Sequence, residues 1–290
     1  MKLLLSVALT TISINNCINN FSDNTLAQTT TPAPTTPQSE IPLPLVRAAP
    51  LVQAVSRLLT QQTYQIESAI ELTTAISDSP AAQAQIRTII AAPNKVNTEI
   101  TFFDGDTALE QQYQIVANGT QVWIYDLEAN QYSVSEYKQF LESTTSLSVG
   151  ILANFYVTTL NRVNNNKIAS RAIAKLPPDR LVKYFQRYAN IDLQNMVVRN
   201  EQLEGQPYAV YDIDATDRTY KVTAFVSPQS SNIERVNLIG QQNGLEILMS
   251  ERVTSQTIPE AIAEDTFNFI PPNNAEQIDR PIIINPLSNQ

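Results

Sequence analysis

The chain has 290 residues, enough for one large domain or two small ones, and its 43% hydrophobic and 16% charged residues are typical of a globular protein. The formal net charge of −9 disfavours nucleic-acid binding, and the absence of histidine excludes histidine-based triads and histidine-ligated zinc. The single cysteine, Cys17, lies in a segment interpreted below as a targeting signal, so thiol catalysis, internal disulfides and cysteine-ligated metals are excluded as well.

The first 27 residues have the pattern of a secretory signal peptide. Lys2 precedes an apolar run from Leu3 to Ile14, which has the length of a signal-peptide hydrophobic region and is too short to span a bilayer comfortably. Ala27 closes a small-residue cleavage site. The alternative is cleavage before a lipid-modified Cys17, but Asn15 and Asn16 are poor residues for that signal. We expect an exported protein that is cleaved after Ala27.

Residues 28–50 are rich in proline and threonine, with six prolines between Thr29 and Pro50. Prolines at this spacing favour an extended chain and prevent a helix from propagating. We therefore expect residues 28–50 to be a linker, residues 51–278 to be the folded domain, and residues 279–290 to be a C-terminal tail.

The folded domain begins with apolar residues at helical spacing, which predict a short amphipathic helix over residues 51–61. The period then changes to two, and strands are expected at 64–73, 85–91, 95–103, 111–117, 121–126 and 131–135. Turn signals at Pro93-Asn94, Asp104-Gly105-Asp106 and Asn118-Gly119 separate several of these strands. Short links between consecutive strands predict an antiparallel meander.

A helical insertion is expected at about 136–190. One helix presents an apolar face that contains Ile151, Leu152, Phe155, Tyr156 and Leu160, and another begins near Asp179. Strands resume at 195–201, 208–214, 219–227, 233–239 and 245–254. This order indicates a mainly β fold of the α+β class: an antiparallel sheet of about ten or eleven strands, curled into most of a barrel and covered by helices.

Two segments of this domain carry a family resemblance. In residues 118–133 a glycine turn leads into a strand centred on Trp123 and Tyr125, and residues 267–275 read FNFIPPNNA. The second segment is similar to a terminal F-x-F-x-P-P-x-G signature. In this order and at this separation the segments resemble the LolA-like family of periplasmic lipoprotein-sorting proteins. The resemblance covers residues 51–278 and implies a half-open antiparallel β-barrel with an N-terminal helix and a helical lid.

The resemblance implies a periplasmic carrier without catalytic activity or cofactor, whose partner is a lipid or an acylated lipoprotein. Each acyl methylene removed from water contributes about 0.8 kcal/mol, so an apolar cavity is sufficient for binding. The expected cavity and lid residues are Trp123, Tyr125, Ile151, Leu152, Phe155 and Tyr156. Trp123 and Tyr125 alternate with Val122 and Ile124, and the sequence leaves open which pair faces the cavity. The alternative is a periplasmic sensor or interaction module of the same fold that binds a membrane regulatory protein.

Two positions depart from the family pattern. Ala92 replaces the arginine of an Arg-Pro-Asn turn that helps to hold the lid closed in the lipoprotein carriers, so the same latch is not expected here. Asn274 occupies the place of the terminal glycine, where asparagine tolerates a positive φ.

Basic residues concentrate between Arg162 and Arg187, where Asp179 is the only acidic residue. One hypothesis is a cationic lid surface that meets an anionic membrane or an acidic protein partner. The alternative is an ordinary solvated helix face. The basic residues assigned to this surface are Lys167, Arg171, Lys175, Arg180, Lys183 and Arg187.

Acidic residues give weaker signals. Asp104 and Asp106 suggest a calcium loop, but a hairpin turn explains them better because no further acidic ligand follows at regular spacing. Asp212 and Asp214 could act as a pair of catalytic carboxylates, yet their alternation with Tyr211 and Ile213 is typical of exposed strand residues. We therefore expect no metal site and no enzyme.

Overall fold

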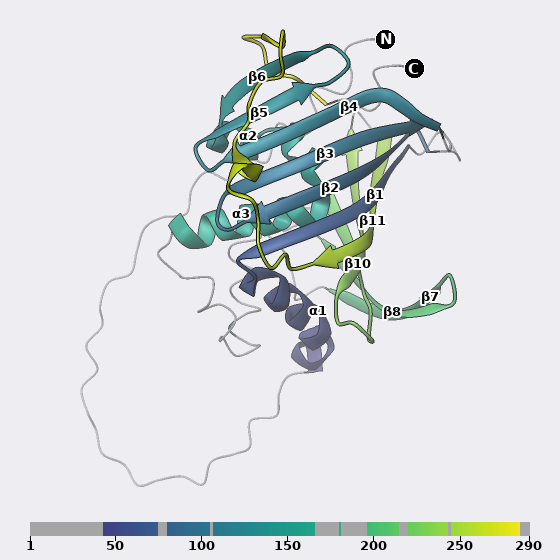
Figure 1. Cartoon of the computed structure of the whole chain (residues 1–290). Helices are drawn as coiled ribbons and strands as arrows, with labels where there is room; N and C mark the ends of the chain where they lie inside the picture. Colours follow the sequence, from purple (N-terminus) through teal and green to yellow (C-terminus); the bar gives the residue numbers. More distant parts are fainter. Residues whose placement is uncertain are drawn as a thin grey trace, which may run out of the picture.

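The computed structural model describes residues 43–74, 80–104, 107–165, 180, 196–214, 220–242 and 245–284. One antiparallel sheet forms the body of this part of the chain (Figure 1). Its strands are β1 (Thr63–Thr74), β2 (Ala82–Ala91), β3 (Lys95–Asp104), β4 (Thr107–Asn118), β5 (Gln121–Asp126), β6 (Gln131–Glu136), β7 (Val197–Leu203), β8 (Gln206–Asp214), β9 (Tyr220–Val226), β10 (Ile233–Gln242), β11 (Leu245–Thr257) and β12 (Glu276–Gln277).

The strand order is β12-β6-β5-β4-β3-β2-β1-β11-β10-β9-β8-β7, so the sheet joins two meanders along β1 and β11. Every pairing is antiparallel except that of β12 with β6. Register shifts at Glu67/Ser68, Thr101/Phe103 and Ile233/Arg235 mark irregularities of the bulge type, which increase twist and bend strands. The sheet curls but stays open, because β12 and β7 end it without pairing with each other.

Helices cover the inner face of this curved sheet. They are α1 (Leu43–Thr60), α2 (Tyr137–Glu142), the 3₁₀ helix η1 (Thr144–Val149) and α3 (Ile151–Asn165). Figure 1 shows α3 behind the N-terminal meander and α1 at the lower end of the sheet. The main hydrophobic core lies between these helices and the strands, and it includes Leu59 of α1, Ile90 of β2 and Leu160 of α3. None of the helices in the described ranges is long and apolar enough to cross a membrane.

The predicted fold class is confirmed: the described chain holds eleven strands of six or more residues, an N-terminal helix and helices over one face. The start of α1 differs from the prediction, because the helix begins at Leu43 and not at residue 51. Pro44 is the second residue of the helix, where a missing backbone N–H costs nothing. Pro50 lies inside the helix, and burial of Ala48 and Leu51 on either side offsets the hydrogen bond that it cannot make. The end of the expected linker is therefore helical.

After β11 the chain runs back over the sheet as a C-terminal strap, residues 258–284, which contains the 3₁₀ helix η2 (Glu264–Phe267) and β12. Figure 1 shows the strap crossing the outer face of the sheet in yellow. Asn97 of β3 donates to the Thr266 carbonyl at 2.6 Å. Beyond β12, Ile282 and Ile284 join the main core, and the Ile282 N–H donates to Ser133 Oγ at 3.1 Å. The strap thus passes around the β6 edge and reaches the inner face.

Candidate functional site

The alternation of side chains along β5 decides which pair faces the helices. Val122 and Ile124 are buried in the main core together with the residues of α1 and α3. Trp123 and Tyr125 belong to a separate cluster on the outer face, with Val116 and Phe269. The helix-covered face is therefore lined by Val122 and Ile124.

Trp123 and Tyr125, which were expected to line the cavity, pack under the strap on the outer face. The Phe269 ring centroid lies 6.2 Å from that of Trp123, 5.9 Å from that of Tyr125 and 5.4 Å from that of Tyr132. The Tyr125 hydroxyl also donates to Asn130 Oδ1 at 2.8 Å. Successive side chains of a strand point to opposite faces, so Trp123 and Tyr125 face away from Val122 and Ile124. On the outer face the strap covers Trp123 and Tyr125 with an apolar residue, Phe269. Both residues fasten the strap.

The other four predicted residues lie on α3, and the structure brings them to the inner face. Ile151, Leu152 and Tyr156 are buried in the main core, and Phe155 is half-buried against it. The Tyr156 hydroxyl donates to the Gln61 carbonyl at the end of α1, so a side chain of α3 holds the two helices together. The Tyr156 and Tyr64 rings stack with centroids 6.2 Å apart.

A buried carboxylate holds the start of α3 to the sheet. Glu251 of β11 is fully buried, and its Oε2 accepts a hydrogen bond from the Leu152 N–H at 2.9 Å. Within the described chain its Oε1 has no hydrogen-bond partner. Burial raises the pKa of Glu251, while hydrogen bonds from the Leu152 N–H, the Ser68 hydroxyl and the Ile151 N–H act in the opposite direction. The positive end of the α3 dipole also favours an acidic group here.

The raised pKa of Glu251 predicts a pH-dependent stability. Between the ordinary glutamate value of 4.5 and the raised value, the folded protein binds more protons than the unfolded chain, so stability falls as pH rises through this window. Glu251→Gln keeps an oxygen for the Leu152 N–H and removes the titration. Urea unfolding between pH 4.5 and 8 should show that the variant gains stability relative to the wild type as pH rises. A difference that stays constant with pH would contradict the prediction.

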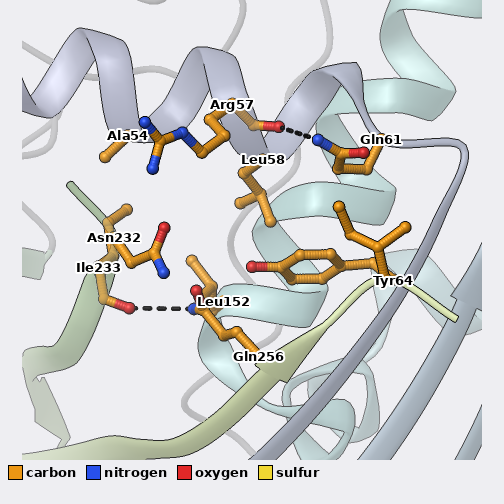
Figure 2. Close-up of a pocket in the computed structure, with 10 residues that line it drawn as sticks. Ala54, Arg57, Leu58, Gln61, Tyr64, Leu152, Asn232, Ile233 and Gln256 are labelled. Atoms are coloured by element: carbon orange, nitrogen blue, oxygen red, sulfur yellow. Dashed lines mark hydrogen bonds between the residues drawn. The ribbon is translucent and has the colours of Figure 1, made fainter. Parts of the chain in front are cut away.

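A cavity of about 210 Å³ opens where α1 and α3 meet β1 and the ends of β10 and β11. Its apolar part comes from both helices and the strand ends, and its polar part from an arginine, a tyrosine and three carboxamides. The lining residues are Ala54, Arg57, Leu58, Gln61, Tyr64, Leu152, Asn232, Ile233, Gln256 and Ile258. Figure 2 shows Leu58 descending from α1 and the Tyr64 ring extending from β1, with its hydroxyl toward the middle of the pocket.

The polar groups of this pocket are suited to binding. Burial raises the pKa of Tyr64 to about 12, against the opposing charge of Arg57, so the Tyr64 hydroxyl stays protonated at neutral pH and can donate. Gln256 Nε2 donates to the Ile233 carbonyl at 3.1 Å, which fixes one carboxamide on the strand side of the pocket. None of the ten lining residues is acidic, so the pocket offers no carboxylate for general acid–base chemistry.

The remaining acidic candidates form structural contacts. Asp212 pairs with Arg199 and accepts from Thr223 Oγ1 at 2.7 Å, with Lys221 Nζ 3.8 Å away. Asp104 ends β3 opposite Thr107 of β4, as expected for a hairpin. Among the residues that the structure describes, no group of acidic or cysteine side chains could hold a metal ion.

Several predicted features lie outside the described residues: the signal segment, Cys17, and the basic residues Lys167, Arg171, Lys175, Lys183 and Arg187. Arg180 is described, and it is exposed. Of the two departures from the family pattern, Asn274 has a φ of 64°, which confirms the expected positive value. Ala92 packs against the main core.

Of the ten lining residues, Leu152 alone was predicted as a site residue from the sequence. Arg57, Gln61 and Tyr64 belong to the predicted first helix and strand, but nothing local distinguishes them from surface residues of those elements. They meet Asn232 and Gln256 only because β1 pairs with β11, a contact between residues far apart in the chain.

Comparisons with protein-family models and with curated proteins find no match. Among solved structures, the chain is similar to an uncharacterized conserved protein from Thermus thermophilus, with a TM-score of 0.41 and 8% identity over 81% of this chain and 99% of that one. It is similar to a LolA superfamily protein from Nitrosomonas europaea, with a TM-score of 0.31 and 13% identity over 77% and 97%. A third is the MucA/MucB complex from Pseudomonas aeruginosa, with a TM-score of 0.34 and 12% identity over 77% and 61%.

Proposed function

We propose that this protein is an exported, non-catalytic carrier that binds the apolar chain of a lipid or acylated protein between α1, α3 and the inner face of the sheet. The observation that carries the proposal is the pocket at the junction of these elements, whose apolar part is continuous with the main core. Leu58, Leu152 and Ile233 belong both to the pocket lining and to that core. A ligand chain that enters the pocket therefore meets residues that are already packed together.

The energetics of such a site favour reversible binding. Each methylene group that leaves water contributes about 0.8 kcal/mol, and the 210 Å³ cavity accommodates a short chain segment. A longer chain requires α1 and α3 to separate further from the sheet. Besides the core packing, polar contacts hold the helices in place: Glu251 of the sheet accepts from the Leu152 N–H, and the Tyr156 hydroxyl joins α3 to the end of α1. Binding would exchange part of the helix–sheet packing for ligand contacts.

Filling the pocket tests this proposal. Ala54 is buried on the pocket side of α1, whereas Ala49 is exposed on the same helix. Ala54→Phe is expected to weaken binding of the neutral fluorescent probe N-phenyl-1-naphthylamine at least tenfold, because the new ring occupies the cavity, and Ala49→Phe should leave binding unchanged. Far-ultraviolet circular dichroism establishes that both variants are folded.

Two results would overturn the proposal. Equal binding of the probe by folded Ala54→Phe and by the wild-type protein would show that the ligand binds outside this pocket. A wild-type protein that takes up neither the probe nor any fatty acyl ligand would reject lipid carriage and favour the alternative of an interaction module with a protein partner.

A further inference from the structure

Arg57 places a positive charge at the pocket without a carboxylate partner. It lies in the last turn of α1, is exposed, and donates through Nη1 to the Ser230 carbonyl at 2.6 Å. This bond fixes the side chain over the turn between β9 and β10 and leaves its other N–H groups available. No ion pair joins Arg57 to an acidic side chain anywhere in the described ranges. Glu234, beside the same turn, accepts instead from Ser230 Oγ and Tyr208 Oη, each at 3.0 Å.

The surroundings of Arg57 do not cancel its charge. The negative end of α1 is capped at this point, because the Arg57 carbonyl accepts from Thr60 Oγ1 at 2.8 Å and from Gln61 Nε2 at 3.4 Å. The charge is also felt inside the pocket, where it opposes the rise in the pKa of Tyr64. Arg57 is the only charged residue among the ten that line the pocket.

The pocket has its charged group on one side. Figure 2 shows the Arg57 guanidinium along α1 on one side of the pocket with Asn232 below it in the view, while Leu58 and the Tyr64 ring lie toward the centre. Arg57 and Asn232 together offer N–H donors beside an apolar interior that includes Ala54, Leu58 and Leu152. Such a site is complementary to a molecule with a negatively charged oxygen-bearing head and an apolar tail.

We propose that the pocket selects single-chain amphiphiles with an oxyanion head, carboxylate or phosphate, which Arg57 binds while the tail enters between α1 and α3. This inference rests on the proposed function and adds the class of ligand and its orientation. The planar guanidinium donates to carboxylate and phosphate oxygens with the same geometry, so the two heads share one recognition chemistry. Neutral heads lack the charge that Arg57 would neutralise.

Displacement of N-phenyl-1-naphthylamine by dodecanoate, dodecyl phosphate and dodecanol tests the inference at pH 8. For the wild type, the charged amphiphiles should bind about tenfold tighter than dodecanol, the factor expected from one charge-assisted hydrogen-bonded contact. Arg57→Gln should abolish that preference, so that the charged amphiphiles bind the variant no tighter than dodecanol does. The matched control is Arg87→Gln, which removes an exposed arginine of β2 that pairs with Glu67 and Glu99 and does not line the pocket. The control should keep the wild-type preference.

The outcomes separate this inference from the proposed function. If all three amphiphiles displace the probe but Arg57→Gln does not change their order, the carrier proposal stands and the role of Arg57 is rejected. If direct titration shows that neither the probe nor any of the three amphiphiles binds the wild type, both are rejected. Tighter binding of dodecanoate identifies a carboxylate head as preferred, and tighter binding of dodecyl phosphate identifies a phosphate head; either order supports the inference.

Discussion

Gly150→Ala is expected to lower the free energy of unfolding by about 2–5 kcal/mol. Gly150 precedes α3 with a φ of +99°, a conformation that residues with a Cβ rarely adopt. A Cβ at this position would lie 2.8 Å from Glu251 Oε1, and that carboxylate is fixed by burial and by the Leu152 N–H. Strain and overlap therefore add at the point where α3 meets the sheet.

Two other glycines provide controls for this prediction. Gly205 has a φ of +78°, and nothing lies within 4 Å of an added Cβ. Gly205→Ala should therefore lower the free energy of unfolding by the backbone strain alone, about 1–2 kcal/mol. Gly240 has open space as well and no positive φ, so Gly240→Ala should be nearly neutral. Chemical unfolding of the three variants should rank them Gly150, Gly205, Gly240. A Gly150 variant no less stable than the Gly205 variant would contradict the packing described for Glu251.

Phe269→Ala is expected to lower the free energy of unfolding by about 3–5 kcal/mol, because the Phe269 ring packs in the aromatic cluster under the strap. Phe269 is buried against Trp123, Tyr125 and Tyr132, and truncation would leave these rings without their partner. Trp123 is the only tryptophan, so its fluorescence reports on this cluster alone. We expect a red-shifted emission in Phe269→Ala together with a lower unfolding midpoint.

The neighbouring residue supplies the control, because Ile270 is 72% exposed. Ile270→Ala should change neither the emission of Trp123 nor the stability appreciably. The same signal tests whether Trp123 belongs to the binding site: a ligand on the inner face should leave Trp123 emission unchanged. A large ligand-induced shift of the Trp123 emission in an otherwise intact protein would show that Trp123 belongs to the binding site.

The fold was predictable from the sequence because its elements follow simple periods. Alternation along β1 through β5 and again along β8 through β11 places apolar residues on one face, and the turns at Asn94 and Gly119 separate the strands as expected. The face of α3 was predictable for the same reason, since Ile151, Leu152 and Tyr156 share one side at helical spacing.

The site was less predictable because it depends on contacts between distant segments. In β5, Trp123 and Tyr125 are as apolar as Val122 and Ile124, and only the strap, some 140 residues later, determines that the aromatic pair is covered on the outer face. Glu251 lies between Ser250 and Arg252 and has no sequence feature that indicates burial; it is buried because α3 begins above it. The periodicity of a sequence predicts which face of an element a residue occupies, but it does not predict which distant segment covers that face.

The helices α1 and α3 are held in place by specific contacts, and they also line the pocket. Glu251 attaches the start of α3 to the sheet, Gly150 leaves room for the Glu251 carboxylate, and the Tyr156 hydroxyl joins α3 to the end of α1. The pocket lies between these attachment points, where Leu58 and Leu152 approach from the two helices. A carrier requires such an arrangement, because the helices must exclude water from the chain when it is bound and move apart when it enters or leaves.

Native mass spectrometry of the full chain, purified without detergent and incubated with dodecanoate, tests the carrier proposal most directly. We expect a complex with one bound dodecanoate per protein. Mild solvent extraction should remove the dodecanoate, and the Ala54→Phe variant should not form the complex. A protein that stays at its unliganded mass at every dodecanoate concentration, while circular dichroism shows it to be folded, would contradict the account.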